Sequence, residues 1–297
     1  MTNKRTYLLI LSTIPALLLL IALGVVINTA SAAMNGRGDQ GERFAASAAG
    51  DPACPVDMIA YWELEESGGP YLDSYGDHDG AHTGTAPAQV AGMFGNAQDF
   101  ASTTTGIDIP SDADFDWGAN DSFSIEFWVQ PDVDECKDHS RVVVGRDDQT
   151  GIQWWVGCAA VSGAATFQLD DSDTVRKVVK GVNITDGAWH HIVAVRDGTN
   201  NFIHLYVDNV LNSVATNTYT GDFTAAADAN INIGWFNHRI DLPAVHRFRG
   251  VIDEVAIYDR ALTSNEVAFH FKGGKGGVAR AYCDDAPTDI FLPIVLK

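Results

Sequence analysis

The chain has 297 residues, 46% of them hydrophobic, which is enough for one large domain with a packed core. Its 39 acidic residues outnumber its 19 Lys and Arg residues, giving a formal net charge of -20. A field of that sign repels polyanions and excludes nucleic acid as a partner, whereas divalent cations and neutral ligands stay open.

The first 32 residues have the pattern of a secretory signal peptide. Lys4 and Arg5 precede an apolar run over 7–27, and Ala30 and Ala32 fit a small-residue cleavage site. The run is nearly long enough to cross a bilayer, so an uncleaved anchor is the alternative. Under either interpretation the chain is exported, secreted or held at the cell surface. A membrane is a partner only if this segment stays uncleaved.

The remaining chain divides into three segments. The polar, Ala- and Gly-rich stretch 33–53 lacks an apolar period and is interpreted as a flexible linker. Residues 54–285 alternate short β-like runs with turns and are predicted to form one domain. Residues 286–297 form an apolar C-terminal tail that is too short to span a membrane.

The pattern of the domain predicts an all-β fold. Many short runs of β-branched and aromatic residues with very little helix are typical of a two-sheet antiparallel β-sandwich. One short C-terminal helix is expected over 263–271, where Thr263 and Glu266 form a capping box before a glycine-rich stop. The candidate strands cover 59–64, 98–102, 107–110, 122–131, 141–146, 152–159, 166–170, 189–196, 202–209, 231–236 and 251–260.

Four cysteines in an exported chain predict two disulfides, for which three pairings exist. No Cys-x-x-Cys occurs, so a zinc or redox motif is not indicated. The positions along the chain favour a terminal clasp between Cys54 and Cys283 and a local bridge between Cys136 and Cys158.

Two adjacent histidines, His190 and His191, lie in the predicted strand 189–196. Side chains alternate between the two faces of a strand, so these two cannot chelate one metal together. They are predicted to be independent strand positions. This strand is expected to pair with 202–209 as a hairpin, because Asn and Gly in the connection tolerate positive φ.

The hairpin WHHIVAVRDGTNNFIHLYVDN resembles the central hairpin of laminin-G-like, concanavalin A-like jelly-roll domains. Three further blocks, 59–80, 122–131 and 248–267, resemble that family in the same order. The resemblance covers roughly residues 58 to 272 and implies a jelly-roll sandwich. It implies less about function, because this sandwich hosts lectins, adhesion modules and hydrolases.

The resemblance also implies a structural calcium ion. The loop 72–82 is dense in carboxylates and loop carbonyls, which suit a hard cation. By resemblance the ligands would be Asp73, the main chain from Gly76 to His78, and Asp253 of the closing strand. The alternative is a solvated acidic turn whose Asp side chains cap local backbone groups.

Catalysis is not indicated. A retaining glycosidase needs two carboxylates about 5–5.5 Å apart, which alternating acidic residues on one strand would supply. The sequence has no acidic run of this kind on a central strand. Glu63 and Glu65 share a face, but they lie on the opening strand of the domain. Serine-hydrolase, zinc-protease and phosphate-loop motifs are also missing from the sequence. A glycoside hydrolase is therefore the less favoured function.

The sequence favours a non-catalytic binding or adhesion module that recognises carbohydrate or a surface polymer at its loop rim. Sugar sites combine aromatic faces with polar side chains, and loops on a rigid scaffold often carry such sites. Core packing of each aromatic residue, or a loop closed on itself, is the structural alternative. A protein-adhesion domain without a sugar site is the functional alternative. The candidate ligand-binding residues are Trp155, Trp235, Phe236, Asn237, His238, Arg239, His246 and Arg247.

Overall fold

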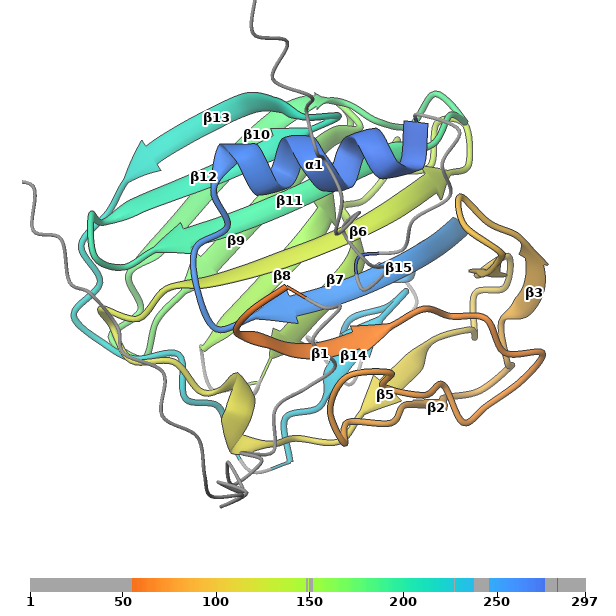
Figure 1. Ribbon diagram of the computed structural model, residues 1–297, viewed down its shortest axis with the longest axis horizontal. Helices are drawn as coiled ribbons and strands as arrows, with labels where there is room; N and C mark the ends of the chain where they lie inside the picture. The colour runs from red at the N-terminus through yellow and green to blue at the C-terminus, as the bar shows by residue number, and fades with distance from the viewer. Residues whose placement is uncertain are drawn as a thin grey trace, which may run out of the picture. The chain divides into compact units, whose positions relative to one another are not determined.

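Two antiparallel β-sheets form the body of the protein, as the sequence predicted (Figure 1). The predicted signal peptide, linker and C-terminal tail lie outside the described residues and stay predictions. In the described ranges no helix is both long and apolar enough to cross a membrane. The computed structural model describes residues 55–147, 149, 152–226, 228–237, 246–275 and 282, all within the structural unit Ser47–Lys297.

The first sheet has eight strands and contains the predicted hairpin. β1 (Met58–Trp62) pairs with the C-terminal half of β15 (Gly250–Tyr258), and β4 (Asn96–Asp99) pairs with the N-terminal half of β15. A bulge at Glu254, which has a φ of 55°, separates these halves. The other strands follow in the order β13 (Val210–Thr216), β12 (Phe202–Val207), β11 (His190–Asp197), β6 (Phe123–Pro131), β15 (Gly250–Tyr258), β4 (Asn96–Asp99) and β3 (Ala88–Ala91).

The second sheet has seven strands, and its register places Gly145, Trp155 and Gln168 in one row. Gly145 lies opposite Trp155, and Trp155 lies opposite Gln168. Directly opposed residues share a face of the sheet. A short 3-10 helix, η1 (Ala113–Phe115), follows β5. The strand order is β10 (Arg176–Asn183), β9 (Ala164–Asp170), β8 (Gln153–Cys158), β7 (Arg141–Asp147), β14 (Ile231–Ile233), β5 (Ile107–Ile109) and β2 (Ala81–His82).

The main core lies between the sheets. Alternate positions of the central strands enter it, such as Ile125 and Phe127 of β6 and Trp154 and Val156 of β8. Burying each such side chain contributes roughly 1.5–3 kcal/mol. Trp155, next to Trp154, must therefore point to the opposite face, and it belongs to a separate small cluster with Val142 and Phe236.

Helix α1 (Ser264–Lys275) lies across the first sheet (Figure 1). The predicted capping box is present: the Thr263 N–H donates to Glu266 Oε2 at 2.8 Å, and the Glu266 N–H donates to Thr263 Oγ1 at 3.3 Å. The helix continues four residues beyond the expected end at Phe271. Glycine lowers helix propensity without forbidding the helix, and the packing of this helix on the sheet outweighs that loss.

A buried polar cluster joins α1 to the sheet. The carboxylate of Glu126 lies 2.9 Å from His191 Nε2 and 2.9 Å from His270 Nδ1, and it accepts a hydrogen bond from the Tyr258 hydroxyl at 2.9 Å. Burial alone would raise the pKa of Glu126, but the two imidazoles lower it to about 2. His190 instead contacts Asp186 and Asp208, so the adjacent histidines act separately, as predicted.

Cys136 and Cys158 form a disulfide with a Cα–Cα distance of 6.0 Å, the local bridge expected from the sequence. It connects the loop after β6 to the end of β8. A structural disulfide is typical of proteins in an oxidising, extracytoplasmic compartment. Cys54 and Cys283 lie outside the described residues, so the terminal clasp stays a prediction.

Candidate functional site

The acidic loop between β1 and β2 is organised around Asp73. Asp73 Oδ1 accepts hydrogen bonds from the N–H groups of Tyr61 (2.9 Å), Tyr75 (3.0 Å) and Gly76 (2.9 Å). Asp73 Oδ2 accepts one from the His78 N–H (3.1 Å) and lies 3.0 Å from His78 Nδ1. Burial alone would raise the pKa of Asp73, but these donors, led by His78, hold it below its ordinary value. Both oxygens thus shape the loop.

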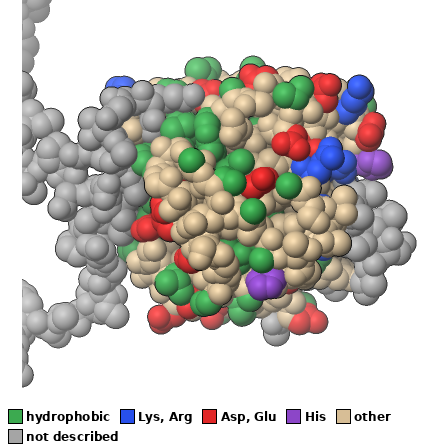
Figure 2. Space-filling view, turned by 90° about the vertical axis from the view of Figure 1, so that its right-hand side faces the viewer, with side chains coloured by type: hydrophobic (Ala, Val, Ile, Leu, Met, Phe, Trp, Pro, Cys, Tyr) green, Lys and Arg blue, Asp and Glu red, His purple; other side chains and the backbone are tan. Residues whose placement is uncertain are grey.

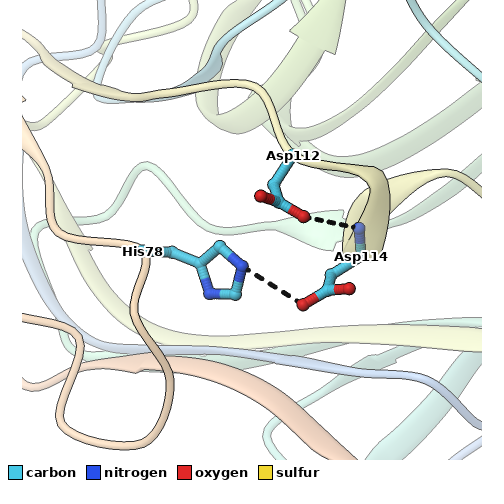
Figure 3. Close-up of side chains that lie close together, drawn as sticks. All are labelled: His78, Asp112 and Asp114. Carbon is cyan, nitrogen blue, oxygen red and sulfur yellow. Dashed lines mark hydrogen bonds and ion pairs between the residues drawn. The ribbon is translucent and has the colours of Figure 1, made fainter.

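His78 faces two acidic residues beside η1 (Figure 3). Asp73 holds the Nδ1 side of the ring, and Nε2 lies 3.4 Å from Asp114 Oδ2. The carboxylate of Asp112 caps η1 by accepting the Asp114 N–H at 3.0 Å. One ligand atom from each of His78, Asp112 and Asp114 lies within 4.8 Å of the others. The hydrogen bond to Asp73 is the main cause that raises the pKa of His78, so a proton competes with any cation there.

This His/Asp cluster borders a pocket of about 820 Å³. The indole of Trp117 forms part of its wall and donates from Nε1 to Asp259 Oδ1 at 3.1 Å. Half of its described lining residues are aspartates: Asp57, Asp77, Asp112, Asp114, Asp116, Asp121 and Asp259. A pocket lined by so many carboxylates attracts cations and repels anions.

A second group of carboxylates lies at the bulge of β15. Asp253 is fully buried, and its Oδ2 accepts the N–H groups of Met93 (2.7 Å) and Phe94 (3.1 Å). Its Oδ1 is buried with no hydrogen-bond partner in the described part of the chain. The neighbouring Glu254 accepts a short hydrogen bond from the Tyr61 hydroxyl. Glu65 accepts the backbone N–H of Asn96 at 2.9 Å, and we call Glu65, Asp253 and Glu254 the Asp253 cluster.

Burial makes the charges of the Asp253 cluster costly. Burial raises the pKa of Asp253 to about 8, and the charge of Glu65 adds to this against the two N–H donors. Burial and the charge of Asp253 likewise raise the pKa of Glu254. A β-carbon on Gly92 would lie 2.5–2.7 Å from three oxygens, those of Phe94 O, Asn96 O and Asp253 Oδ2. Converging carbonyl and carboxylate oxygens are the ligands that calcium prefers.

Trp155 lies at a smaller pocket, of about 200 Å³, on the outer face of the second sheet. Gly145 in the opposed strand leaves space there: a β-carbon would come within 2.7 Å of the Phe236 ring. Phe236 can therefore lie beside Trp155. We call this cavity the Trp155 pocket; its lining residues are Ser140, Val142, Gln153, Trp155, Gln168, Arg176, Phe236 and His246.

One buried carboxylate, Asp170, orders the polar side of the Trp155 pocket. Arg176 donates to it from Nε (2.8 Å) and Nη2 (2.7 Å). The side-chain amides of Gln153 and Gln168 also donate from Nε2 to Asp170 Oδ2. His246 contacts the Ser140 carbonyl through Nδ1 at 3.2 Å. The pocket thus combines two aromatic rings with fixed polar groups, the usual composition of a small-molecule site.

Trp235 and Arg247 contact each other instead of lining this pocket. The Arg247 guanidinium lies 4.7 Å from the centre of the Trp235 ring. Trp235 is 8% exposed and donates from Nε1 to Asp108 at 2.8 Å, while Arg247 donates to the Thr105 carbonyl. The Asn237 N–H donates to Asn232 Oδ1 at 3.0 Å. These contacts attach Trp235, Asn237 and Arg247 to neighbouring segments of the second sheet.

The sequence profile of the concanavalin A-like lectin/glucanases superfamily matches residues 101–268, which is more than half of the chain. The chain belongs to this superfamily. A comparison with curated proteins gives no match.

Three solved structures illustrate the fold of this superfamily member. The binding domain of Paraclostridial Mosquitocidal Protein 1 has a TM-score of 0.59 at 14% identity, over 73% of this chain and 52% of that one. The serotype D botulinum neurotoxin ligand binding domain in complex with N-acetylneuraminic acid has a TM-score of 0.56 at 13% identity, over 73% of this chain and 51% of that one. Domain 4 of the extracellular arabinanase from Geobacillus stearothermophilus, in complex with arabinotriose, has a TM-score of 0.51 at 21% identity, over 72% of this chain and 97% of that one.

The chain spans about half the length of the two toxin domains. At these identities the similarity shows the fold, and the sites have to be argued from the residues of this lectin/glucanase-type domain itself.

The sequence-predicted site residues fall into separate places on this concanavalin A-like sandwich. Of the ligand-binding set, Trp155, Phe236 and His246 meet at one pocket, and His238 and Arg239 lie outside the described residues. Of the metal set, Asp73 and Asp253 share no hydrogen-bond partner among the described residues, so they organise two different regions. Sequence reasoning did not assign Glu65, Gln153, Gln168 or Arg176, because only the fold brings these residues next to Asp253 or Trp155.

Proposed function

We propose that this chain is an exported, non-catalytic carbohydrate-binding module whose ligand occupies the Trp155 pocket. The observation that carries the proposal is one indole and one phenyl ring beside amide and guanidinium groups fixed by Asp170. Trp155 is 9% exposed and Phe236 is 2% exposed, so the indole is the ring that would contact the C–H side of a sugar, with Phe236 supporting it from behind. The fixed polar groups would bind the sugar hydroxyls. The module would act in the secreted protein or at the cell surface.

The similar solved structures give this proposal its general support. Two of them are held in complex with sugars, arabinotriose in one and N-acetylneuraminic acid in the other. Those ligands belong to those proteins, and the fold alone does not transfer them. A binding role also agrees with the buried position of the Asp253 cluster: Asp253 and Glu254 are no more than 1% exposed, so no substrate reaches them.

We further propose that calcium is bound structurally at the Asp253 cluster. Asp253 and Glu65 would supply carboxylate oxygens, and the segment from Gly92 to Asn96 would supply carbonyls. The ion would neutralise carboxylates that burial makes costly, and it would fasten the strand pair β3–β4 to β15. This departs from the sequence-based expectation in replacing Asp73, Gly76 and His78 by Glu65 and the 92–96 segment.

The binding proposal is tested with a glycan array probed by the calcium-loaded wild-type protein and by Trp155→Ala. Phe269→Ala is the matched control, because Phe269 is an exposed aromatic residue on α1, on the other sheet. We expect binding that Trp155→Ala removes and Phe269→Ala keeps. Retained binding in Trp155→Ala would place the sugar site elsewhere. No binding to any glycan, with capture of an envelope protein instead, would favour the adhesion alternative.

A further inference from the structure

We infer that the Trp155 pocket selects a neutral sugar residue and rejects an acidic one. This inference rests on the proposed carbohydrate-binding function and names the class of sugar that the same pocket takes. It follows from the charges and the hydrogen-bond polarity of the pocket, step by step.

The positive charge of Arg176, which lines the pocket, is already neutralised by Asp170. Arg176 forms two of its hydrogen bonds to Asp170 from Nε and one from Nη2, and Asp170 is 2% exposed. The Asp170 side chain is 3% exposed and the Arg176 side chain is 60% exposed, and the charges of the pair cancel. The paired guanidinium therefore adds little attraction for a sugar carboxylate.

Asp170 also fixes the direction of both amides. The Gln153 and Gln168 side chains both donate from Nε2 to this carboxylate. The other polar atom of each amide is its carbonyl oxygen, which is an acceptor. Both residues line the pocket, so these oxygens are the amide atoms left to accept a hydrogen bond from a ligand. Sugar hydroxyls can donate to such acceptors, whereas a carboxylate, itself an acceptor, cannot.

The volume of the pocket and the negative charge of the protein also favour a single neutral sugar residue. A volume of about 200 Å³ is below the roughly 300–1,000 Å³ of sites for drug-sized ligands, so the pocket suits one sugar residue. The chain carries a formal net charge of -20. Figure 2 shows Asp and Glu side chains scattered over one face, with fewer Lys and Arg, mostly on one side of it. This field adds long-range repulsion of anionic glycans.

The test compares neutral and acidic oligosaccharides of equal length by titration calorimetry with the calcium-loaded protein, at low and at high salt. The probes are arabinan, galactan and glucan fragments against polygalacturonate and sialylated fragments. We expect neutral fragments alone to bind, with affinity that changes less than about twofold with salt. Gln168→Leu, which removes one acceptor, should weaken binding about tenfold, with a cooperative thermal unfolding transition as the check on folding.

The outcomes separate the inference from the function. Trp155-dependent binding of an acidic glycan, weakened by salt, would overturn the inference and leave the proposed function standing. An unchanged affinity of a folded Gln168→Leu for a neutral sugar would also overturn it. If no sugar binds, or if binding survives Trp155→Ala, the proposed function itself fails.

Discussion

Replacing Asp253 with Asn tests how the buried carboxylates at β15 are held. The pKa of Asp253 rises from an ordinary 3.8 to about 8, chiefly through burial. Between about pH 4 and about pH 8, and without a cation, the Asp253 carboxyl is protonated in the folded state but ionised in the unfolded chain. The free energy of unfolding therefore falls as the pH rises through that window. From about pH 4 to about pH 7 the loss is on the order of 4 kcal/mol, at about 1.4 kcal/mol per pH unit.

An amide at position 253 has no proton to lose. In chelator at neutral pH we expect Asp253→Asn to be more stable than wild type, and its stability to depend less on pH. In millimolar calcium the order should reverse, because the ion neutralises the wild-type carboxylate and binds the amide more weakly. The assay is urea unfolding at several pH values from about 5 to about 8, with calcium and with chelator.

Asp57→Asn is the control, since Asp57 is exposed and its replacement removes the same charge. It should behave like wild type under all conditions. The reasoning is refuted if Asp253→Asn is destabilised to the same extent in chelator at every pH, with no response to calcium. That result would mean that the hydrogen bonds to Met93 and Phe94, and not the desolvated charge, dominate at this site.

Four further predictions concern the scaffold and the Trp155 pocket. Replacing the Cys136–Cys158 pair by two alanines should lower the free energy of unfolding by about 3 kcal/mol in chemical denaturation, because the bridge closes a loop with a sequence separation of 22. Glu126→Gln should lower the free energy of unfolding by about 3–5 kcal/mol. It should also remove the loss of stability that wild type shows as the pH falls from about 4 toward about 2, because the pKa of this carboxyl is depressed in the folded state. An unchanged acid transition would contradict this. His270→Ala should flatten the dependence near neutral pH, because the pKa of His270 is raised and its contribution is lost as the pH rises. Gly145→Ala should weaken sugar binding at least tenfold by displacing the aromatic rings of the pocket; calorimetry that finds equal affinity would contradict the packing described.

The central strands and the helix could be predicted from the sequence because their patterns are strong. The Thr263–Glu266 capping box, the hairpin, and the opposite faces of His190 and His191 depend on local spacing alone. Four edge strands were missed: β13 and β3 of the first sheet, and β10 and β2 of the second. Their residues are largely exposed, so none of them shows the alternation of a half-buried strand.

The sites were less predictable because they depend on contacts between distant segments. The Asp253 cluster joins Glu65 to a residue 188 positions later, and the intervening Gly92–Asn96 segment has no acidic signature. The polar wall of the Trp155 pocket depends on the register of β8, β9 and β10, which a single sequence does not state. Trp235 illustrates the converse: an aromatic residue in a cationic loop is engaged by Asp108 and Arg247 within the protein.

The most direct test of the central claim is to locate the sugar by NMR. The indole N–H resonance of Trp155, identified with a Trp155→Phe variant, would be followed while a neutral oligosaccharide is titrated into the calcium-loaded protein. We predict that this resonance and the side-chain amide resonances of Gln153 and Gln168 shift together with a single dissociation constant. Shifts confined to residues of the acidic pocket near Trp117, with the Trp155 resonance unmoved, would contradict it.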